Sequence, residues 1–213
     1  MILSEVRETV LKAALEMSRL GLIRGTSGNI SARDSATGYV AITPTSLPYE
    51  TLKTEDIPVV TVSGEVVEGK HKSSSETPMH TAIYRARPDV MAVIHTHSVY
   101  ATVFSVLNRP LPVVTVPLVF AGGPVPVAPF ALPGSNELAD VAVKALGKGS
   151  SVLLQNHGVI CVAPDMKKAM AAAIYVEEGA QVGFLALSAG GLNPIPEAYV
   201  EKMRLAVSKG AAL

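Results

Sequence analysis

The sequence is poor in three features that would each suggest a class of protein. Its single cysteine, Cys161, lies in the apolar run GVICVA, so an internal disulfide is excluded and a buried structural thiol is favoured over a nucleophile. The 18 basic residues equal the 18 acidic residues, which argues against a nucleic-acid or anionic-membrane surface. The longest uncharged span, residues 110–136, is interrupted by seven prolines, which excludes a continuous membrane helix there.

Length and N-terminal composition favour one cytoplasmic domain. The start MILSEVRETVLK carries charges early and lacks the basic and then apolar regions of a signal peptide. At 213 residues the chain is long enough to bury a sizeable core, and it shows no repeat, linker or low-complexity segment. We therefore expect a single domain over residues 1–213, located in the cytoplasm.

Hydrophobic periodicity and turn residues predict helices and strands along the whole chain. The expected helices cover residues 5–20, a stretch from near Ser75, 99–107, 136–146, a long segment from the cap Asp165 to about 189, and one from near Pro196. The expected strands or extended segments cover residues 29–33, 39–43, 58–62, 91–95, 113–116, 125–128, 151–155 and 159–162. Strands in the middle with helices at both ends predict one three-layer α/β/α domain.

Two histidines stand one residue apart at the end of an apolar run, in VIHTHSVY, residues 93–100. If the run is a strand, His95 and His97 point to the same face, about 6.6 Å apart at their Cα atoms. Imidazoles at that spacing can converge on one metal ion. A polar strand end without a metal fits the same pair, so a metal site needs a third ligand.

The candidate third ligand is His157 in LLQNHGVI. It stands at a turn between two apolar strands, where Gly158 would let the backbone double back. A histidine that is merely hydrogen-bonded in a hairpin turn fits this position as well. Three histidines with one open position nevertheless form a known catalytic zinc pattern. The two other histidines, His71 in a charged turn and His80 on a helix, are expected to have ordinary roles.

Three polar stretches are candidate anion sites. SSSE, Ser73 to Glu76, places hydroxyls where a helix starts, and both free backbone N–H groups and the helix dipole favour negative charge there. Simple N-capping by Ser74 or Ser75 explains part of this motif equally well. GTSGNIS, residues 25–31, and TPTS, residues 43–46, offer further donors, although loops of such composition are common.

Taken together and in order, five motifs resemble one family. RLGLIRGTSGNIS, ITPTSLPYE, GKHKSSSETPMH, VIHTHS and LLQNHGVI are similar to the class II aldolase and adducin family, typified by L-fuculose-1-phosphate aldolase. The similarity runs from the first helix to the long helix after His157. It implies an α/β/α fold around a mixed, mainly antiparallel sheet. It also implies a homotetramer with four-fold symmetry and active sites at subunit interfaces.

The resemblance also implies the roles of individual residues. His95, His97 and His157 would hold one zinc ion per subunit, and Glu76 would be the general acid/base and a further metal ligand when no substrate is bound. The substrate phosphate would be held by six residues: Gly28, Asn29, Thr45, Ser46, Ser74 and Ser75. The implied reaction is reversible cleavage of a ketose 1-phosphate into dihydroxyacetone phosphate and an aldehyde, with Zn²⁺ as Lewis acid and the carboxylate moving a proton at carbon.

Three departures from the family pattern concern the substrate. Val116 stands where the fuculose-phosphate enzyme has a tyrosine, the C-terminal MRLAVSKGAAL lacks a second family tyrosine, and Ser46 replaces a phosphate-contacting glycine. The dihydroxyacetone-phosphate half of the site is therefore kept and the aldehyde half altered. Tyr100 or Tyr199 could substitute for the missing tyrosine.

Other activities on the same scaffold stay open. L-ribulose-5-phosphate 4-epimerase resembles the chain at these motifs but carries aspartate where Glu76 stands, which disfavours it. Sugar-phosphate dehydratases and decarboxylases of the family reuse the same metal and anion pocket. A non-catalytic, adducin-like interaction protein is disfavoured, because keeping a buried cluster of three histidines and a glutamate is costly without a use.

Overall fold

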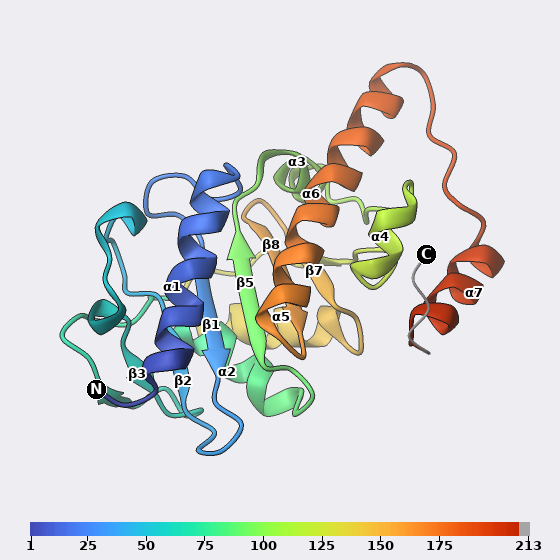
Figure 1. Ribbon diagram of the computed structural model, residues 1–213. Helices are drawn as coiled ribbons and strands as arrows, with labels where there is room; N and C mark the ends of the chain where they lie inside the picture. Colours follow the sequence, from blue (N-terminus) through green and yellow to red (C-terminus); the bar gives the residue numbers. More distant parts are fainter. Residues whose placement is uncertain (209–213) are drawn as a thin grey trace.

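The computed structural model describes residues 1–208, which are built around an eight-stranded sheet (Figure 1). The strand order is β4-β3-β2-β1-β5-β8-β7-β6, and all neighbours are antiparallel except the parallel pair β6–β7. The strands are β1 (Asn29–Arg33), β2 (Val40–Ile42), β3 (Val59–Val60), β4 (Val66–Glu68), β5 (Ala92–Thr96), β6 (Val127–Ala128), β7 (Ser151–Leu154) and β8 (Gly158–Ala163). The predicted mixed, mainly antiparallel sheet is confirmed.

Helices cover both faces of this sheet, and each face carries its own apolar core. One face is covered by α1 (Ser4–Arg19), α3 (Val99–Val106), α4 (Val116–Phe120) and α6 (Met166–Ser188), the other by α2 (Thr77–Ala86) and α5 (Asn136–Leu146). The last helix, α7 (Glu197–Ser208), lies beside α4. Because both faces are buried, β5 and β8 are apolar at successive positions rather than alternately, which confirms the three-layer α/β/α prediction.

Several predicted elements differ in detail from those observed. The expected extended segment at 113–116 is wrong at Val116, which is the first residue of the short helix α4. The strand β4 and two short 3₁₀ helices, Tyr49–Thr51 and Thr54–Asp56, were not expected. The helix expected from near Ser75 begins at Thr77 with Glu76 as its N-cap, so neither serine caps it. The last five residues of the C-terminal stretch, and with them the end of the predicted domain 1–213, lie outside the described part.

The long helix α6 is a core helix of the domain. By length and composition alone it could cross a membrane. Its buried positions, however, are small residues that pack against the sheet and against α3 and α4. A Cβ at Gly179 would lie 3.1 Å from Leu118, and one at Gly183 would lie 3.2 Å from Phe104. The composition of α6 is therefore explained by close helix packing.

The turn between β7 and β8 approaches the end of β5 closely. Asn156 in this turn has a left-handed backbone, φ 56°, so Asn156 rather than Gly158 makes the reversal. Gly158 is needed for another reason, since a Cβ there would clash with the carbonyl oxygen of Thr96. This contact brings His157 against the end of the strand that carries His95.

Candidate metal centre and active site

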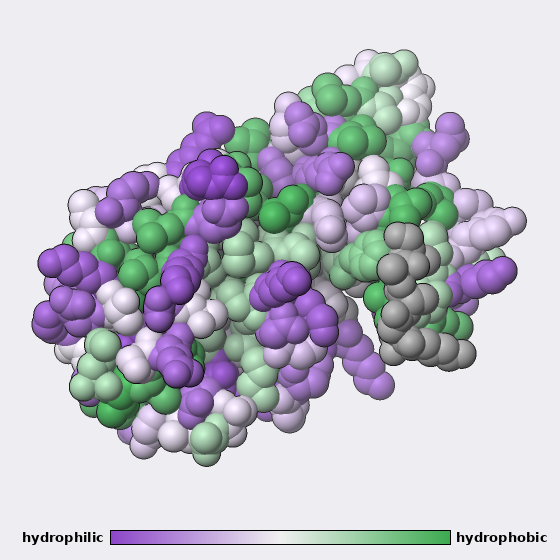
Figure 2. Space-filling view, in the orientation of Figure 1, coloured by the Kyte–Doolittle hydropathy of each residue, from purple (hydrophilic) through white to green (hydrophobic). Residues whose placement is uncertain are grey.

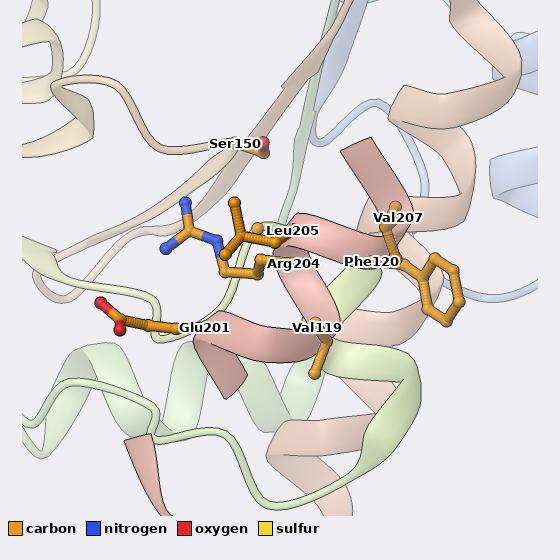
Figure 3. Close-up of a pocket in the computed structure, with 8 residues that line it drawn as sticks. Val119, Phe120, Ser150, Glu201, Arg204, Leu205 and Val207 are labelled. Atoms are coloured by element: carbon orange, nitrogen blue, oxygen red, sulfur yellow. The ribbon is translucent and has the colours of Figure 1, made fainter. Parts of the chain in front are cut away.

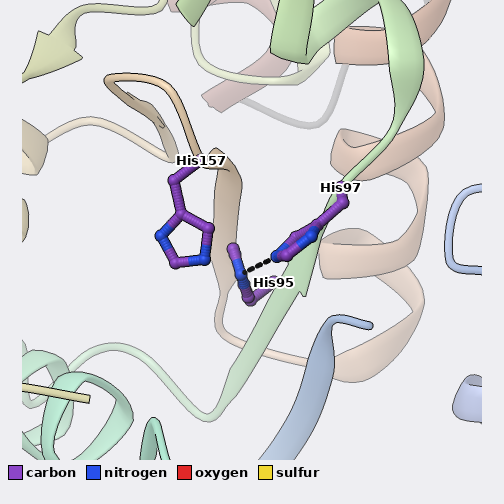
Figure 4. Close-up of side chains that lie close together, drawn as sticks. All are labelled: His95, His97 and His157. Atoms are coloured by element: carbon purple, nitrogen blue, oxygen red, sulfur yellow. Dashed lines mark hydrogen bonds between the residues drawn. The ribbon is translucent and has the colours of Figure 1, made fainter. Parts of the chain in front are cut away.

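Three histidine rings converge at the ends of β5 and β7 (Figure 4). The ring centroids of His95, His97 and His157 are 4.8 Å apart in every pair, with interplanar angles of 69°, 70° and 76°. The rings thus form a near three-fold propeller, and one ring nitrogen of each lies within 4.8 Å of the other two. The structure brings together the three residues predicted to bind metal.

Each histidine is positioned by a different part of the backbone. His95 lies in β5, is completely buried, and its Nδ1 donates to the carbonyl oxygen of Val159 at 3.0 Å. Because the hydrogen is on Nδ1, Nε2 of His95 carries a free lone pair. This nitrogen faces Nε2 of His97 at 2.9 Å. His97 is one residue beyond the strand, and His157 extends from the β7–β8 turn.

The carboxylate of Glu76 closes one side of this group from the start of α2. Its Oε2 lies 3.1 Å from Nε2 of His95, and its Oε1 lies 3.5 Å from Nε2 of His157. Among the described residues Oε1 is a buried oxygen without a hydrogen-bond partner. Nε2 of His95 and Oε2 of Glu76 both present lone pairs, and two lone pairs at this distance repel one another. A positive centre between the two atoms, a proton or a metal ion, would stabilise the arrangement.

The electrostatics of the cluster favour unprotonated imidazoles. Burial is the largest cause that lowers the pKa of both His97 and His157, to about 4 in each case. Burial raises the pKa of the Glu76 carboxyl, but His95, His157 and the hydrogen bond from Asn29 outweigh that effect, so the net pKa is lowered. Near neutral pH His97 and His157 therefore present neutral nitrogen donors next to the carboxylate of Glu76, and a divalent metal takes such donors.

The residues present fit a metal ion. Tetrahedral zinc with Zn–N bonds of about 2.0–2.1 Å would hold its ligand atoms about 3.3–3.4 Å apart. The observed separations of 2.9 Å between two histidine nitrogens and 3.1 Å to Glu76 are close to that value. His95, His97 and His157 could therefore hold a divalent ion, with Glu76 beside it.

The predicted phosphate-binding residues come from three neighbouring loops. Pro44 pairs with Ser73, the N–H of Thr45 donates to Lys72, and the N–H of Ser74 donates to Thr43, so the TPTS and SSSE motifs run side by side. Ser46 has φ 59°, the backbone of the glycine that it replaces in the family pattern. A cavity of about 510 Å³ beside these loops is lined by Ser74, Ser75, Lys72, Arg85 and Gly134, among others.

Gly28 and Asn29 join this group through the first strand. Gly28 has φ 73°, and a Cβ there would lie 2.6 Å from the carbonyl oxygen of His95, so only glycine fits. Asn29 is 6 % exposed, lies opposite His95 in the sheet, and its Nδ2 donates to Oε2 of Glu76 at 2.9 Å. Asn29 therefore links the predicted phosphate loops to Glu76, the predicted acid/base residue.

Comparison with known proteins agrees with this geometry. The sequence model described as "Class II Aldolase and Adducin N-terminal domain" matches residues 8–184. The chain belongs to the class II aldolase and adducin family.

Its relatives in this family are enzymes of sugar-phosphate chemistry by their names. A 5-deoxy-D-ribulose 1-phosphate aldolase from Bacillus thuringiensis serovar kurstaki is 39 % identical over 95 % of both chains. A solved structure of an L-fuculose 1-phosphate aldolase is 36 % identical, covers 98 % of both chains and superposes with a TM-score of 0.94. An L-ribulose-5-phosphate 4-epimerase from Salmonella paratyphi A is 31 % identical over 94 % of this chain and 93 % of its own. The chain is thus an enzyme of the class II aldolase family, and its relatives include both aldolases and an epimerase.

The sequence did not reveal the role of His80. It was expected to be ordinary, but it is completely buried, and its Nε2 is 2.6 Å from Oδ1 of Asn29. Glu76 and His80 are four residues apart and therefore lie on the same side of α2. That spacing is the one signal in the sequence that could have connected His80 with the site.

Two residues of the altered aldehyde half, Val116 and Tyr199, lie on the surface. Val116 is 46 % exposed at the start of α4, and Tyr199 is 63 % exposed on α7. Tyr100 packs its ring against Phe184 on α6.

Cys161 is buried, and burial raises the pKa of its thiol to about 12, which confirms a structural thiol.

A second cavity of about 550 Å³ lies between α4 and α7 (Figure 3). Val119 and Leu205 form part of its apolar lining, while Arg204 and Glu201 extend over it. Its lining includes no histidine and no member of the predicted phosphate loops. The group of His95, His97 and His157, and not this cavity, is therefore the candidate active site.

Proposed function

We propose that the protein is a zinc-dependent aldolase that reversibly cleaves a ketose 1-phosphate into dihydroxyacetone phosphate and an aldehyde. The observation that carries this proposal is the arrangement of Glu76 against two histidines of a three-histidine propeller. Three neutral nitrogen donors suit a catalytic zinc with an open position. A carboxylate beside such a site can move a proton at a carbon of the substrate.

Binding would begin at the phosphate. The three loops that carry Gly28, Thr45 and Ser74 meet beside the metal-ligand group, and α2 directs its N-terminus to the same place. Free backbone N–H groups, hydroxyls and the helix dipole there favour an anion. Anchoring this non-reacting end lets binding energy orient the carbons that react.

Glu76 is the proposed acid/base. When bound, the metal would supply Lewis-acid stabilisation of the negative charge that develops on the ketone and neighbouring hydroxyl oxygens. In the cleavage direction the hydroxyl on C4 loses its proton to solvent and becomes the aldehyde carbonyl. The bond between C3 and C4 breaks, its electron pair stays with the dihydroxyacetone-phosphate half, and the carboxyl of Glu76 gives C3 a proton that it regains from solvent. In synthesis the carboxylate removes that proton. The lowered pKa of Glu76 keeps the group ionised and ready to accept it.

The aldehyde partner differs from that of the fuculose-phosphate enzyme in this proposal. Val116 has no hydroxyl with which to act on the aldehyde-side oxygen. A smaller or less polar aldehyde is therefore expected. The relative named for 5-deoxy-D-ribulose 1-phosphate supports a substrate of this kind.

We also propose a homotetramer with active sites at subunit interfaces, in the cytoplasm. Apolar side chains gather over the C-terminal half of α6 and over α4 (Figure 2). Val182, Leu185, Val116 and Phe120 are 41–53 % exposed on these helices, which is unusual for large apolar residues unless a partner covers them. Sedimentation analysis of the purified protein should give four chains per particle, and a monomer at working concentration would contradict the assembly.

The proposed activity is tested by metal analysis together with an assay for dihydroxyacetone phosphate. About one zinc per chain, with triose-phosphate release from a member of a ketose 1-phosphate panel, is the expected result. Zinc without release would favour an epimerase, dehydratase or decarboxylase, and L-ribulose 5-phosphate should then be the first further substrate, given the 31 % identical epimerase. Absence of bound metal would favour a non-catalytic adducin-like role.

A further inference from the structure

Behind Glu76 lies a chain of four buried polar side chains, and only Asn29 among them has a predicted role in the proposed mechanism. Its hydrogen bonds run from Tyr84 Oη to Ser31 Oγ at 2.8 Å, from Ser31 Oγ to His80 Nδ1 at 2.7 Å, and from His80 Nε2 to Asn29 Oδ1 at 2.6 Å. The last bond joins Asn29 Nδ2 to Glu76 Oε2 at 2.9 Å. Tyr84, Ser31 and His80 are at most 1 % exposed, so each depends on its neighbours in the chain for hydrogen bonding.

The direction of every bond in this chain follows from the charge on Glu76. An ionised carboxylate only accepts, so Asn29 must present its NH₂ group to Oε2 and its Oδ1 to His80. Nε2 of His80 must then carry a hydrogen. Complete burial lowers the pKa of His80 to about 3, so the ring is neutral and its Nδ1 accepts from Ser31. Ser31 in turn accepts from Tyr84, and all four donors point toward the carboxylate.

The two oxygens of Glu76 are thereby made unequal. Oε2 faces the N–H of an amide that cannot turn over without breaking its bond to His80. A proton placed on Oε2 would leave two donors facing one another. Oε1 has no hydrogen-bond partner among residues 1–208 and faces His157. It is the oxygen that can carry a proton at no cost in hydrogen bonds.

We propose that His80 is a positioning residue which, through Asn29, holds Oε2 of Glu76 as a fixed acceptor and reserves Oε1 for the proton exchanged with the substrate carbon. This inference rests on the proposed function of Glu76. In the synthetic direction the C–H bond breaks, an O–H bond forms at Oε1, and the electron pair of the C–H bond stays with the substrate. His80 itself does not touch the substrate.

The first test measures the tautomer of His80 in the full-length, metal-loaded protein. Histidine labelled with ¹⁵N and a long-range ¹H–¹⁵N correlation distinguish the two neutral forms, and loss of the signal in His80→Gln assigns it. We expect the neutral form with hydrogen on Nε2. Hydrogen on Nδ1, or on both nitrogens near neutral pH, would overturn the proposal whether or not the protein is an aldolase.

The second test follows exchange of a carbon-bound hydrogen of dihydroxyacetone phosphate with D₂O, which needs Glu76 but no aldehyde. His80→Gln can still donate to Asn29, whereas His80→Leu cannot. We expect His80→Leu to lower the exchange rate at saturation about 10- to 100-fold with unchanged KM and zinc content, and His80→Gln to restore most of it. Equal loss in both variants, or a rise in KM alone, would contradict a positioning role.

A graded series keeps the test valid if His80→Leu does not fold. Ser31→Ala removes the hydroxyl that donates to Nδ1, and Tyr84→Phe removes only the last donor of the chain. The loss of exchange should be larger for Ser31→Ala than for Tyr84→Phe. The reverse order would overturn the proposal, while absence of exchange in the unaltered protein would instead overturn the proposed function.

Discussion

Asn29 and His95 lie directly opposite one another on the antiparallel strands β1 and β5. The start of β1 adjoins a predicted phosphate loop, and His95 at the end of β5 and His97 just beyond it belong to the group that could bind a metal. Their pairing places both groups at one edge of the sheet. The same pairing holds Gly28 close against the backbone of His95.

Gly28→Ala should destabilise the fold strongly. The added Cβ would lie 2.6 Å from the carbonyl oxygen of His95 and 2.6 Å from Ile23 Cγ2, at a residue with φ 73°. Left-handed strain and overpacking together cost about 2–5 kcal/mol. Urea unfolding of the metal-free protein measures the change without a contribution from metal binding.

Gly25→Ala is the matched control for this substitution. Gly25 has φ 60°, but a Cβ there meets nothing within 4 Å, so only the backbone strain of about 1–2 kcal/mol remains. Equal destabilisation by the two substitutions would show that the contact with His95 does not restrict this loop.

His95→Ala should empty the metal site. His95 faces both His97 and Glu76, so its removal leaves too few nitrogen donors for tight binding. Metal analysis after dialysis should show a fall from about one ion per chain to near zero, with circular dichroism to confirm folding. His71→Ala, which removes a surface histidine paired with Asp56, should keep the ion. A full complement of metal in His95→Ala would refute the assignment.

Glu76→Gln should keep the metal and lose turnover. The amide has nearly the same shape but cannot exchange a proton with carbon, and acid/base groups typically contribute about 10²- to 10⁴-fold to rate. The measurement is kcat with metal content determined on the same sample. Glu8→Gln on the exposed side of α1, where Glu8 pairs with Lys12, should leave both values unchanged. Full activity of Glu76→Gln would assign the proton transfer to another group.

The group of three histidines could be predicted from the sequence only with the help of the family resemblance. His95 and His97 are two residues apart at a strand end and His157 lies in a short turn, but each fits an ordinary polar role as well, and the resemblance decided between the two. The spacing argument extended strand geometry to His97, beyond the strand predicted over residues 91–95, and β5 itself ends at Thr96. The three imidazole rings converge all the same, because the β7–β8 turn approaches the end of β5 closely and brings His157 to His95 and His97.

The hydrogen-bond network could not be predicted, since it depends on contacts between distant segments. Ser31 and His80 are separated by 49 residues and meet only because α2 packs on β1. The start of α4 at Val116 was not predicted for a similar reason. The apolar residues of α4 fit a strand equally well by sequence, and it is packing against α6 that favours the helix. Local propensity gives the elements, and packing decides such ambiguous segments.

The metal-free protein should lose stability as the pH falls from about 6.5 toward 4. The pKa values of His97 and His157 are lowered from 6.5 to about 4, and that of His80 to about 3. Between those values the unfolded chain binds protons that the folded protein does not, so acid favours unfolding. Each histidine adds at most about 1.4 kcal/mol per pH unit to this slope. Urea unfolding at a series of pH values measures it.

The contribution of one histidine to this pH dependence of the free energy of unfolding can be measured with one variant. His157→Gln removes one of the three histidines, so its stability should fall less steeply over the same pH range. Glu76 acts in the same direction at lower pH, because its lowered pKa makes the ionised form a property of the folded state that is lost once the group is protonated. A stability independent of pH between 6.5 and 4.5 would mean that these imidazoles are not held neutral by burial, and the fit of the site to a metal ion would then lose its electrostatic support.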